Sequence, residues 1–516
     1  MTDKQKGLGN LYTPVTGIYK HREWRGLKDT AYDYKMWCGL WGTLLKWALG
    51  SPVTNVKAIF RYRWMYHYLT VPAFYDRLME GMNGAALRAA RNNMNTLAVS
   101  VTDLLDALFE ADLHLHPDSE KAKAAGEKIL LVDELIPSLV FRGFPTLKTI
   151  LQQEIPEYLP SLINCHSPDH YIAESESYGL PADVCPLPST ELGIAIDDDY
   201  PLINAKAFVS CNMPCDGSIM TSALQDRRYN LPTYPLNIPL RWKNDETFEY
   251  AVSEVKAMIK FVEDQYGVKY DYDALRKAVE IWNQQIELRY EKWELNRTQI
   301  PPHTGSTLWL YSIFEHQVTC GDTACLENDK KVNEYLRKQV ADKECPKEIR
   351  HRAILWNTPA NMYANFNTWL LNCWGIDSVA EMIDFQGYDI IDTSTDEAML
   401  RGVVKQIEGA TMRVHTKGGI DVMMDDLWRK YEEFNGDMII MFDQISCKGV
   451  GAINGYFEEE AKKRGIPFVW VKQDLFETTS ISRRSMREDI NNFMTLVMQE
   501  EPLDQSLVDF DDEKCW

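Results

Sequence analysis

Basic residues are scarce in this sequence relative to acidic ones. Its 516 residues include 55 Lys and Arg against 76 Asp and Glu, so the formal net charge is -21 at pH 7 and the pI is near 5.0. Proteins that bind nucleic acid neutralise its phosphates with a basic face. We find no basic patch with interleaved aromatic residues, and we therefore expect no nucleic acid among the partners.

The chain also lacks a hydrophobic run long enough to cross a membrane. Its N-terminus, MTDKQKGLGN, has none of the apolar core of a signal peptide. The most apolar early segment, residues 36–49, is about two-thirds as long as a membrane span and contains Lys46. We therefore expect a soluble, cytoplasmic protein without a membrane partner.

A glycine-rich phosphate loop of the form G-x-x-x-x-G-K-[ST] is absent as well. The backbone amides and the lysine of that loop hold the phosphates of ATP in P-loop enzymes. We do not expect this chain to be a P-loop ATPase, so an ATP-driven step would need a separate protein.

Cysteine occurs eleven times, but the compact cysteine runs of ferredoxins are missing. Cys211 and Cys215 have three residues between them, which matches neither a zinc knuckle nor a thioredoxin pair. Free thiols or metal ligands are the usual roles of cysteine in the cytosol. Cys38 and Cys373 lie among large apolar residues and are predicted to be small buried side chains, whereas Cys515 follows an acidic run in a tail predicted to be disordered.

The length of the chain, 516 residues and 59.6 kDa, is too great for one hydrophobic core. The first part is rich in aromatic residues with helical spacing, and later parts alternate strand-like and helical segments. We predict a helical N-terminal domain (1–125), a first α/β domain (126–305), a helical connection (306–345), a second α/β domain (346–505) and an acidic tail (506–516).

The clearest pattern lies between residues 436 and 474. The apolar run 438–442 predicts a buried strand, a glycine-bearing loop with Cys447 follows, and residues 453–463 have helical spacing with basic residues at the end. Gly465 and Pro467 end that helix before a strand at 468–471. This is a β-loop-α-β unit with a cysteine at the carboxyl end of its first strand, where open parallel sheets bind ligands.

An earlier stretch repeats this pattern. It predicts a strand at 205–210, Cys211 and Cys215 in the next loop, a helix at 218–228 and a strand at 234–238. Two α/β units that are far apart in sequence thus place thiols on equivalent loops. The sequence predicts an α/β fold with parallel sheets.

Three cysteines share this placement, since Cys185, Cys215 and Cys447 each follow an apolar segment and precede a helix. The free amides and the dipole at a helix N-terminus stabilise a thiolate, which is the form that binds iron. Spacing alone leaves two alternatives open, a metal site and ordinary free thiols.

Four segments together resemble a known family. In order and spacing, they are DVCPLPSTELG, SCNMPCDG followed by RRYNLP, GVKYDYDALRK, and SCKGVGAINGYFEEEAKKRGIPFVWVKQD. They are similar to subunits of the 2-hydroxyacyl-CoA dehydratases and the related ATP-dependent benzoyl-CoA reductases, over roughly residues 128–500. The resemblance implies two open parallel-sheet domains, Rossmann-like or flavodoxin-like, facing a cleft that holds a [4Fe-4S] cluster on three cysteines. Motif matching gives Cys185, Cys215 and Cys447 as ligands, with Cys211 as the competitor for the middle place.

The resemblance also implies a reaction. One electron added to a 2-hydroxyacyl-CoA thioester gives a ketyl radical that expels the 2-hydroxyl, and the electron is returned after a base removes the β-proton. The base implied by the family is Glu134, in DELIPSLVFRGFP, with Glu174 and Glu176 as further candidates. Arg483 and Arg484 match a polar stretch of the family and are predicted to face solvent as ordinary helix residues.

Partners follow from the same resemblance. They are an acyl-CoA substrate, a second related cluster-bearing subunit or a second copy of the chain, and an ATP-dependent activator dimer that supplies the electron.

We predict an iron-sulfur subunit of a 2-hydroxyacyl-CoA dehydratase, a lyase, and three alternatives stay open. A benzoyl-CoA reductase subunit would use the same fold. A double-cubane reductase would need more ligands, such as Cys165, Cys320, Cys325 or Cys345. A scaffold subunit would bind no cluster.

Overall fold

The computed structural model describes most of the chain, and the account below is limited to these residues. They are 26–50, 52–63, 84–111, 119–133, 136–151, 161, 166–197, 199, 205–212, 216–239, 244–302, 320–344, 348–358, 360, 363, 365–382, 388–409 and 419–509.

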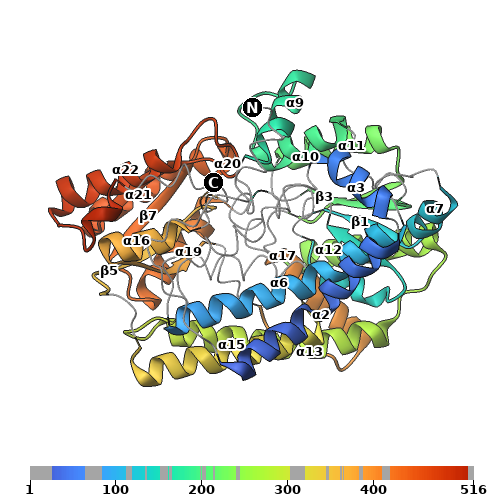
Figure 1. Ribbon diagram of the computed structural model, residues 1–516, viewed down its shortest axis with the longest axis horizontal. Coiled ribbons are helices and arrows are strands. Elements are labelled where there is room, and N and C mark those ends of the chain that lie inside the picture. The colour runs from blue at the N-terminus through green and yellow to red at the C-terminus, as the bar shows by residue number, and fades with distance from the viewer. Residues whose placement is uncertain are drawn as a thin grey trace.

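Two four-stranded parallel sheets form the framework (Figure 1). The first contains β1 (Ile129–Val132), β2 (Lys148–Leu151), β3 (Ala207–Cys211) and β4 (Thr233–Leu236) in the order β2-β1-β3-β4. The second contains β5 (His351–Trp356), β6 (Ile376–Glu381), β7 (Met438–Gln444) and β8 (Phe468–Gln473) in the order β6-β5-β7-β8. Both orders match the first four strands of a flavodoxin-type sheet, and in such sheets ligands bind at the carboxyl ends of the strands. The predicted α/β class with parallel sheets is confirmed.

Helices surround both sheets. They are α2 (Leu27–Gly50), α3 (Pro52–Arg61), α6 (Gly84–Ala111), α7 (Glu120–Gly126), α9 (Asp169–Tyr178), α10 (Pro186–Asp197), α11 (Asp216–Tyr229), α12 (Asp245–Tyr266), α13 (Tyr272–Asn296), α15 (Thr323–Asp342), α16 (Phe366–Trp374), α17 (Asp396–Glu408), α19 (Ile420–Glu433), α20 (Lys448–Gly451), α21 (Asn454–Arg464) and α22 (Arg483–Asn492). A 3₁₀ helix, η2, spans Ser138–Gly143, and Phe493–Met498 form a π-helical turn. No helix in the described ranges is both long and apolar enough to cross a membrane.

The strands form where the sequence is continuously apolar. All four residues of β1 are buried, as are the first five of β7, because helices cover both faces of a parallel sheet. The strands predicted at 438–442 and 468–471 are confirmed as β7 and β8. The strand predicted at 205–210 is β3, but it extends through Cys211, so the prediction that Cys211 lies in the loop is wrong.

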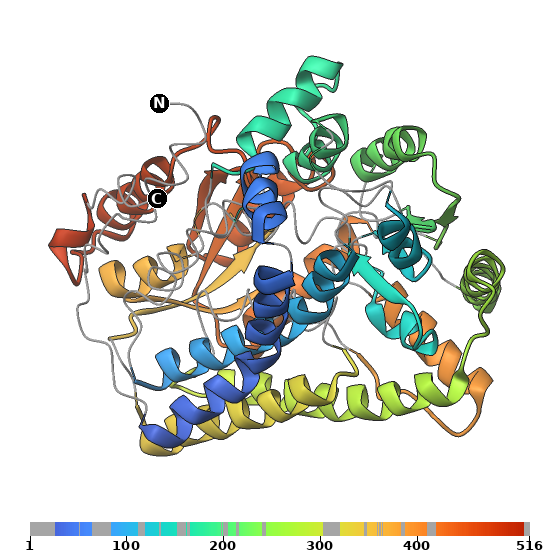
Figure 2. The ribbon, with the colours of Figure 1, turned by 45° about the vertical axis from the view of Figure 1, so that its right-hand side comes forward.

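Four long helices, α2, α6, α13 and α15, form a layer along one side of both sheets (Figures 1 and 2). Buried residues of α6, such as Met94 and Ala98, belong to the same core as the strands of the second sheet. The described elements before β1 are helices. The layer thereby connects the N-terminal helices to the second sheet.

Helix α17 packs on the first sheet, although in the chain it lies between two strands of the second sheet. It follows β6 in the chain, yet its buried residues Met399, Val403 and Ile407 belong to the core of the first sheet. There it contacts α12 and α13. Each sheet therefore has its own core, and the chain crosses between the two cores more than once.

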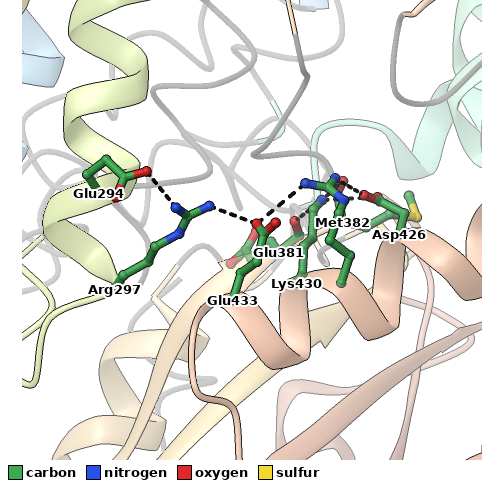
Figure 3. A network of polar contacts seen from close by, with 8 residues as sticks. Glu294, Arg297, Glu381, Met382, Asp426, Lys430 and Glu433 are labelled. Atoms are coloured by element: carbon green, nitrogen blue, oxygen red, sulfur yellow. Dashed lines mark hydrogen bonds and ion pairs between the residues drawn. The ribbon is translucent and has the colours of Figure 1, made fainter.

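Lys430 ties α19 to the end of β6 (Figure 3). Its fully buried Nζ donates to Glu381 O at 3.0 Å and to Met382 O at 2.8 Å, and it lies 3.3 Å from Asp426 Oδ2. Carbonyls at the end of a strand need a donor when they are buried. The lysine supplies it, and Asp426 balances the buried charge.

The same polar network reaches α13 through Arg297 (Figure 3). Arg297 Nη2 donates to Glu433 Oε2 at 2.8 Å, and its Nη1 donates to Glu294. Arg429 lies between Glu433 and Asp426 and pairs with both. A continuous chain of ion pairs thus connects the carboxyl end of α13 to the second sheet.

Candidate functional site

Cys185 lies on the loop that enters α10, and it is half-buried. Cys185 packs against Leu187 in the first turn of α10 and against Leu475 and Phe476, which follow β8 of the second sheet. Ser189 holds the start of α10 on this loop, because its N and Oγ donate to Cys185 O at 3.2 Å and 2.9 Å. A residue from the first half of the chain is thus seated on the second half.

Cys447 follows β7 and is the N-cap residue of the short helix α20. It is half-buried and packs against the core of the second sheet. Its backbone N donates to Gln444 O at 3.1 Å, which folds the loop back onto the end of β7. The predicted position at the carboxyl end of the first strand of the unit is confirmed, and α20 precedes the predicted helix, α21.

Gln444 connects these two cysteine loops. Its Nε2 donates to Cys185 Sγ at 3.6 Å, while its carbonyl accepts from Cys447 N. Lys448 Nζ and Asp183 Oδ2, the neighbours of the two cysteines, pair at 2.6 Å. That pair is exposed and contributes little free energy, but it shows that the loops meet.

A second contact between the two halves lies beside the cysteine loops. Thr478 Oγ1 donates to Asp169 Oδ2 at 2.9 Å, and His166 Nδ1 lies 2.9 Å from the same hydroxyl. His166 and Asp169 stand at the start of α9, whereas Thr478 follows β8. The loop before α9 and the loop after β8 are therefore held together by side-chain hydrogen bonds.

The amide of Gln444 is oriented by neighbouring strand ends. Thr358 Oγ1 donates to Gln444 Oε1, and Gln473 Nε2 donates to Thr358 O at 2.8 Å. Because its oxygen is occupied, Gln444 presents its Nε2 to the Cys185 sulfur. N–H donors to a sulfur stabilise the thiolate and tune a bound metal.

Asp474 directly follows β8 and is buried beside the Cys447 loop. Ser446 Oγ donates to its Oδ2 at 2.8 Å, and Oδ1 has no hydrogen-bond partner within the described part of the chain. Burial raises the pKa of Asp474 to about 6, although the hydrogen bond from Ser446 opposes the shift. A carboxyl group with a pKa near neutrality can take up or release a proton under working conditions.

Sequence reasoning missed Gln444, Ser446 and Asp474. Ser446 and Asp474 lie inside the motif that carries Cys447, and all three residues lie at or just after the end of an apolar strand, which was the available signal. Their roles depend on contacts between neighbouring strand ends, and a single sequence does not show these contacts.

Of the other predicted ligands and the predicted base, the structure describes only Cys211. Cys215 and Glu134 lie outside the described residues. Cys211 is buried at the end of β3, where Asp133 Oδ2 accepts from its N at 3.2 Å and from its Sγ at 3.7 Å. A thiol that donates to a carboxylate keeps its proton, whereas iron binding needs a thiolate. This contact favours a structural role for Cys211, and the choice of Cys215 as the middle ligand stays a prediction.

The two further candidates for the base and the two arginines of the family stretch lie on helices α9 and α22. Glu174 is half-buried and Glu176 is exposed on α9. Arg484 faces solvent and pairs with Glu488, as predicted. The same prediction is wrong for Arg483, which is buried with its guanidinium over the ring of Tyr363.

The other described cysteines differ in exposure. Cys373 is buried as predicted, and burial raises the pKa of its thiol to about 12. Burial likewise raises the pKa of Cys320 and Cys325, so both favour the neutral thiol that does not ligate iron. Cys38 is exposed, so the prediction that it is buried is wrong. Cys165 and Cys345 lie outside the described residues.

The described side chains can be tested as ligands of the [4Fe-4S] cluster that the family resemblance implies. Within the described ranges, no three His, Cys, Asp or Glu side chains lie close enough together to hold a metal ion. Two of the three predicted ligands, Cys185 and Cys447, are described, are half-buried and come from loops that meet at Gln444. Soft thiolates with an N–H donor to sulfur fit iron-sulfur ligation.

Comparison with known proteins gives two matches. A family model described as 2-hydroxyglutaryl-CoA dehydratase, D-component (HGD-D), matches residues 142–495. The protein YjiM of Escherichia coli (strain K12), named as a dehydratase subunit, is 26% identical over 199 residues, which are 37% of this chain and 49% of YjiM. The chain thus spans about half the length of this curated relative. The family match covers more than half of the chain, from η2 to the π-helical turn, and includes the loops of Cys185 and Cys447. The chain therefore belongs to the 2-hydroxyglutaryl-CoA dehydratase D-component family.

Proposed function

We propose that this chain is the iron-sulfur subunit of a 2-hydroxyacyl-CoA dehydratase, a lyase that removes water from a 2-hydroxyacyl-CoA thioester. Besides the family match, the main support for the proposal is the contact between the two cysteine loops. Gln444 joins the Cys185 loop to the Cys447 loop through the contact of its Nε2 with Cys185 Sγ at 3.6 Å and the bond from Cys447 N to its carbonyl. The loops of two thiols that are far apart in sequence are thereby held together.

In this proposal Cys185, Cys215 and Cys447 hold a [4Fe-4S] cluster. When bound, such a cluster supplies a low-potential electron and one iron without a protein thiolate, which can take an oxygen of the substrate. Gln444 orients Cys185 and lowers the charge on its sulfur through the N–H contact. Leu187, Leu475 and Phe476 pack against the same half-buried residue and give it an apolar surrounding on one side.

Loss of water requires two proton transfers, one away from carbon and one to the leaving hydroxyl. We assign the first to Glu134, by its position in the family motif. We assign the second to Oδ1 of Asp474, which has no hydrogen-bond partner among the described residues and belongs to a carboxyl group of pKa about 6. Ser446 holds the other oxygen of that carboxyl group and keeps it beside the Cys447 loop.

Partners belong to the proposal as well. The curated relative YjiM is named as a subunit, which supports a multi-subunit enzyme. We propose that a related subunit or a second copy completes the enzyme, and that an ATP-dependent activator delivers the electron. The absence of a phosphate loop from the sequence agrees with an external activator.

The test starts from protein purified without oxygen together with its partners. We expect a brown protein with broad absorbance near ~400 nm, as iron-sulfur clusters show. The Cys185→Ala/Cys447→Ala double variant should be colourless, and Cys373→Ala is the matched control because it removes a buried thiol on helix α16. A colourless native protein would overturn the proposal in favour of a scaffold subunit.

The second arm of the test identifies the reaction. The activated enzyme is incubated with 2-hydroxyacyl-CoA and aryl-CoA thioesters while reductant is limiting. We expect many molecules of 2-enoyl-CoA per electron supplied, because dehydration returns the electron. Dienoyl-CoA formed in proportion to the electrons consumed would show ring reduction instead, and would contradict the assignment as a lyase.

A further inference from the structure

Helix α2 packs on the rest of the molecule with one face only. Met36, Leu40 and Thr43 are buried on that face. Its contact with α6 is fixed by polar bonds, since Trp37 Nε1 donates to Asn95 Oδ1 at 2.9 Å and Asn95 Nδ2 donates to Asp33 Oδ1 at 2.9 Å. These contacts hold α2 firmly, so its opposite face has a defined orientation.

The opposite face is apolar and exposed. Its large side chains are exposed by 82% (Leu27), 70% (Tyr34), 57% (Trp41) and 59% (Leu45). Figure 2 turns this helix, in dark blue, toward the viewer on the outer side of the helical layer. We call the exposed apolar row the α2 seam, and its members are Leu27, Ala31, Tyr34, Cys38, Trp41, Leu45 and Ala48.

The spacing along the α2 seam alternates regularly between four and three residues. This is the spacing of the a and d positions of a coiled coil, sustained over three heptads. Single exposed apolar residues are common on protein surfaces, but a contiguous row of them marks an interaction site. The row continues onto α3, where Val53, Val56 and Phe60 are exposed.

The α2 seam is also separate from the part of the chain that defines the family. The family match begins at residue 142, whereas α2 and α3 end before residue 62. The α2 seam therefore lies outside the residues that the family model matches, and its partner need not be one that those residues bind.

We propose that the α2 seam binds the α2 seam of a second copy of this chain as an antiparallel helix pair. A two-fold axis near residue 36 places Trp41 against the partner's Ala31, Tyr34 against the partner's Cys38 and Leu45 against the partner's Leu27. Each bulky ring then faces a small side chain, which is how facing core positions interdigitate. A parallel pair would instead place Trp41 on the partner's Trp41 and Tyr34 on the partner's Tyr34.

The charge of α2 and the area of its exposed face are compatible with binding to a second copy of this chain. The chain has a net charge of -21, but α2 itself contains three lysines and two aspartates, so two α2 helices do not repel strongly. Its 24 residues span about 36 Å. A contact strip of this length and about 12 Å wide covers on the order of 400 Å² on each copy, so the pair buries on the order of 800 Å², the range of a small, concentration-dependent interface.

The first test measures the mass of the complete chain in solution by light scattering after gel filtration. We expect twice the chain mass of 59.6 kDa at micromolar concentration. Trp41→Glu/Leu45→Glu should raise the dimer Kd at least 100-fold and give a monomer. Leu496→Glu is the matched control, because Leu496 is 74% exposed outside the α2 seam, and this variant should remain dimeric. A monomeric native chain would overturn the proposal, whether or not another protein then occupies the seam.

The second test determines the direction of the pair by oxidative cross-linking of cysteines. Tyr34→Cys, which keeps Cys38, should form a disulfide-linked dimer at least ten times faster than the native chain. Tyr34→Cys/Cys38→Ser should not, because antiparallel helices separate the two introduced thiols. Equal cross-linking of both variants would show a parallel pair and contradict the proposed geometry. Circular dichroism shows that each variant is folded.

Discussion

The two sheets have the same strand order. In each sheet, a polar residue directly after the first strand hydrogen-bonds to the backbone of the neighbouring central strand. In the first sheet, Asp133 follows β1 and accepts from Cys211 N at the end of β3. In the second, Asn357 follows β5, and its Nδ2 donates to Phe442 O on β7 at 2.6 Å. Each of these side chains joins the central strands at the point where the direction of the strand order reverses.

The two carboxyl edges differ in what lies beyond this shared bond. In the second sheet, Thr358, Gln444 and Gln473 form a further polar layer, and Asp474 retains an oxygen without a hydrogen-bond partner in the described residues. In the first sheet, the described thiol at the strand end, Cys211, is buried against Asp133. Equal topology thus does not give equal chemistry, because reactive groups belong to strand ends and loops.

The largest expected effect comes from removing the two thiols whose loops meet at Gln444. Cys185→Ala and Cys447→Ala should each lose most of the bound iron and reduce turnover to background, because a cluster with two thiolates is unstable. Iron assay of protein purified without oxygen measures the loss. We expect the same result for Cys215→Ala.

Two controls accompany these variants. Cys38→Ser removes an exposed thiol on α2 and should keep its iron. Cys211→Ala removes a thiol bonded to a carboxylate and should also keep it. Iron lost only from Cys211→Ala, and not from Cys215→Ala, would make the buried strand end of the first sheet the ligand site.

The second prediction concerns the carboxyl group at the second sheet. Asp474→Asn should lower turnover by about 100-fold or more, the usual contribution of a positioned acid or base. A steady-state assay with the activated enzyme measures it. Ser446→Ala, which removes only the hydrogen bond to Oδ2, should have a smaller effect. Unchanged turnover in Asp474→Asn would exclude Asp474 from proton transfer.

Asp474→Asn should also change the free energy of unfolding. Burial raises the pKa of Asp474 from 3.8 to about 6, so the folded chain retains a proton that the unfolded chain loses as pH rises through that interval. The native free energy of unfolding therefore falls between pH 4 and 6 and stays lower above it. Asp474→Asn removes this penalty and should stabilise the protein at pH 7 by up to about 3 kcal/mol. Denaturant unfolding at pH 4 and 7 tests the sign.

The third prediction addresses the buried charge of the second sheet. Lys430→Met should lower the free energy of unfolding by about 3 kcal/mol, since it leaves two buried carbonyls without their donor and Asp426 with Arg429 as its remaining cation. Lys462→Met on α21 is the control, because Lys462 is exposed in its pair with Glu458 and should change stability by less than about 0.5 kcal/mol. Equal effects of the two variants in urea unfolding would contradict the role of Lys430.

The smallest effect is expected at the opposite, amino edge of the second sheet. His351 Nε2 hydrogen-bonds to Glu500 Oε1 at 2.9 Å, and Nδ1 lies 3.7 Å from Asp437 Oδ1. Asp437 and Glu500 raise the pKa of His351 against the opposing effect of burial. The stabilisation is therefore complete below the pKa of an unfolded histidine and is lost as pH rises through the folded pKa.

His351→Gln tests this expectation. It should cost about 1 kcal/mol at pH 5.5, the usual value of a hydrogen bond, and less at pH 9. Thermal unfolding of both proteins at the two pH values measures the difference. A loss that grows with pH would reverse the sign and contradict the charged state of His351.

The sequence predicted those elements whose signals are local. Helices α12 and α13 begin where Asn244 and Asp271 cap their first turns, and Gly267 ends the first of them, so neighbouring residues determine these bounds. Strand β6 was missed because it contains Asp377 and Glu381, and both are buried. A polar pattern conceals a central strand when tertiary contacts satisfy its charges.

For the candidate site, the sequence by itself determined that Cys185 and Cys447 each stand directly before a helix and that Cys447 follows a strand, since these are local patterns. Only the tertiary structure decided that their loops meet at Gln444, that Asp474 is buried beside them, and that α17 packs on the first sheet rather than its own. Burial and contact arise from groups hundreds of residues apart. Strand periodicity and helix caps, in contrast, depend on neighbours within a few positions.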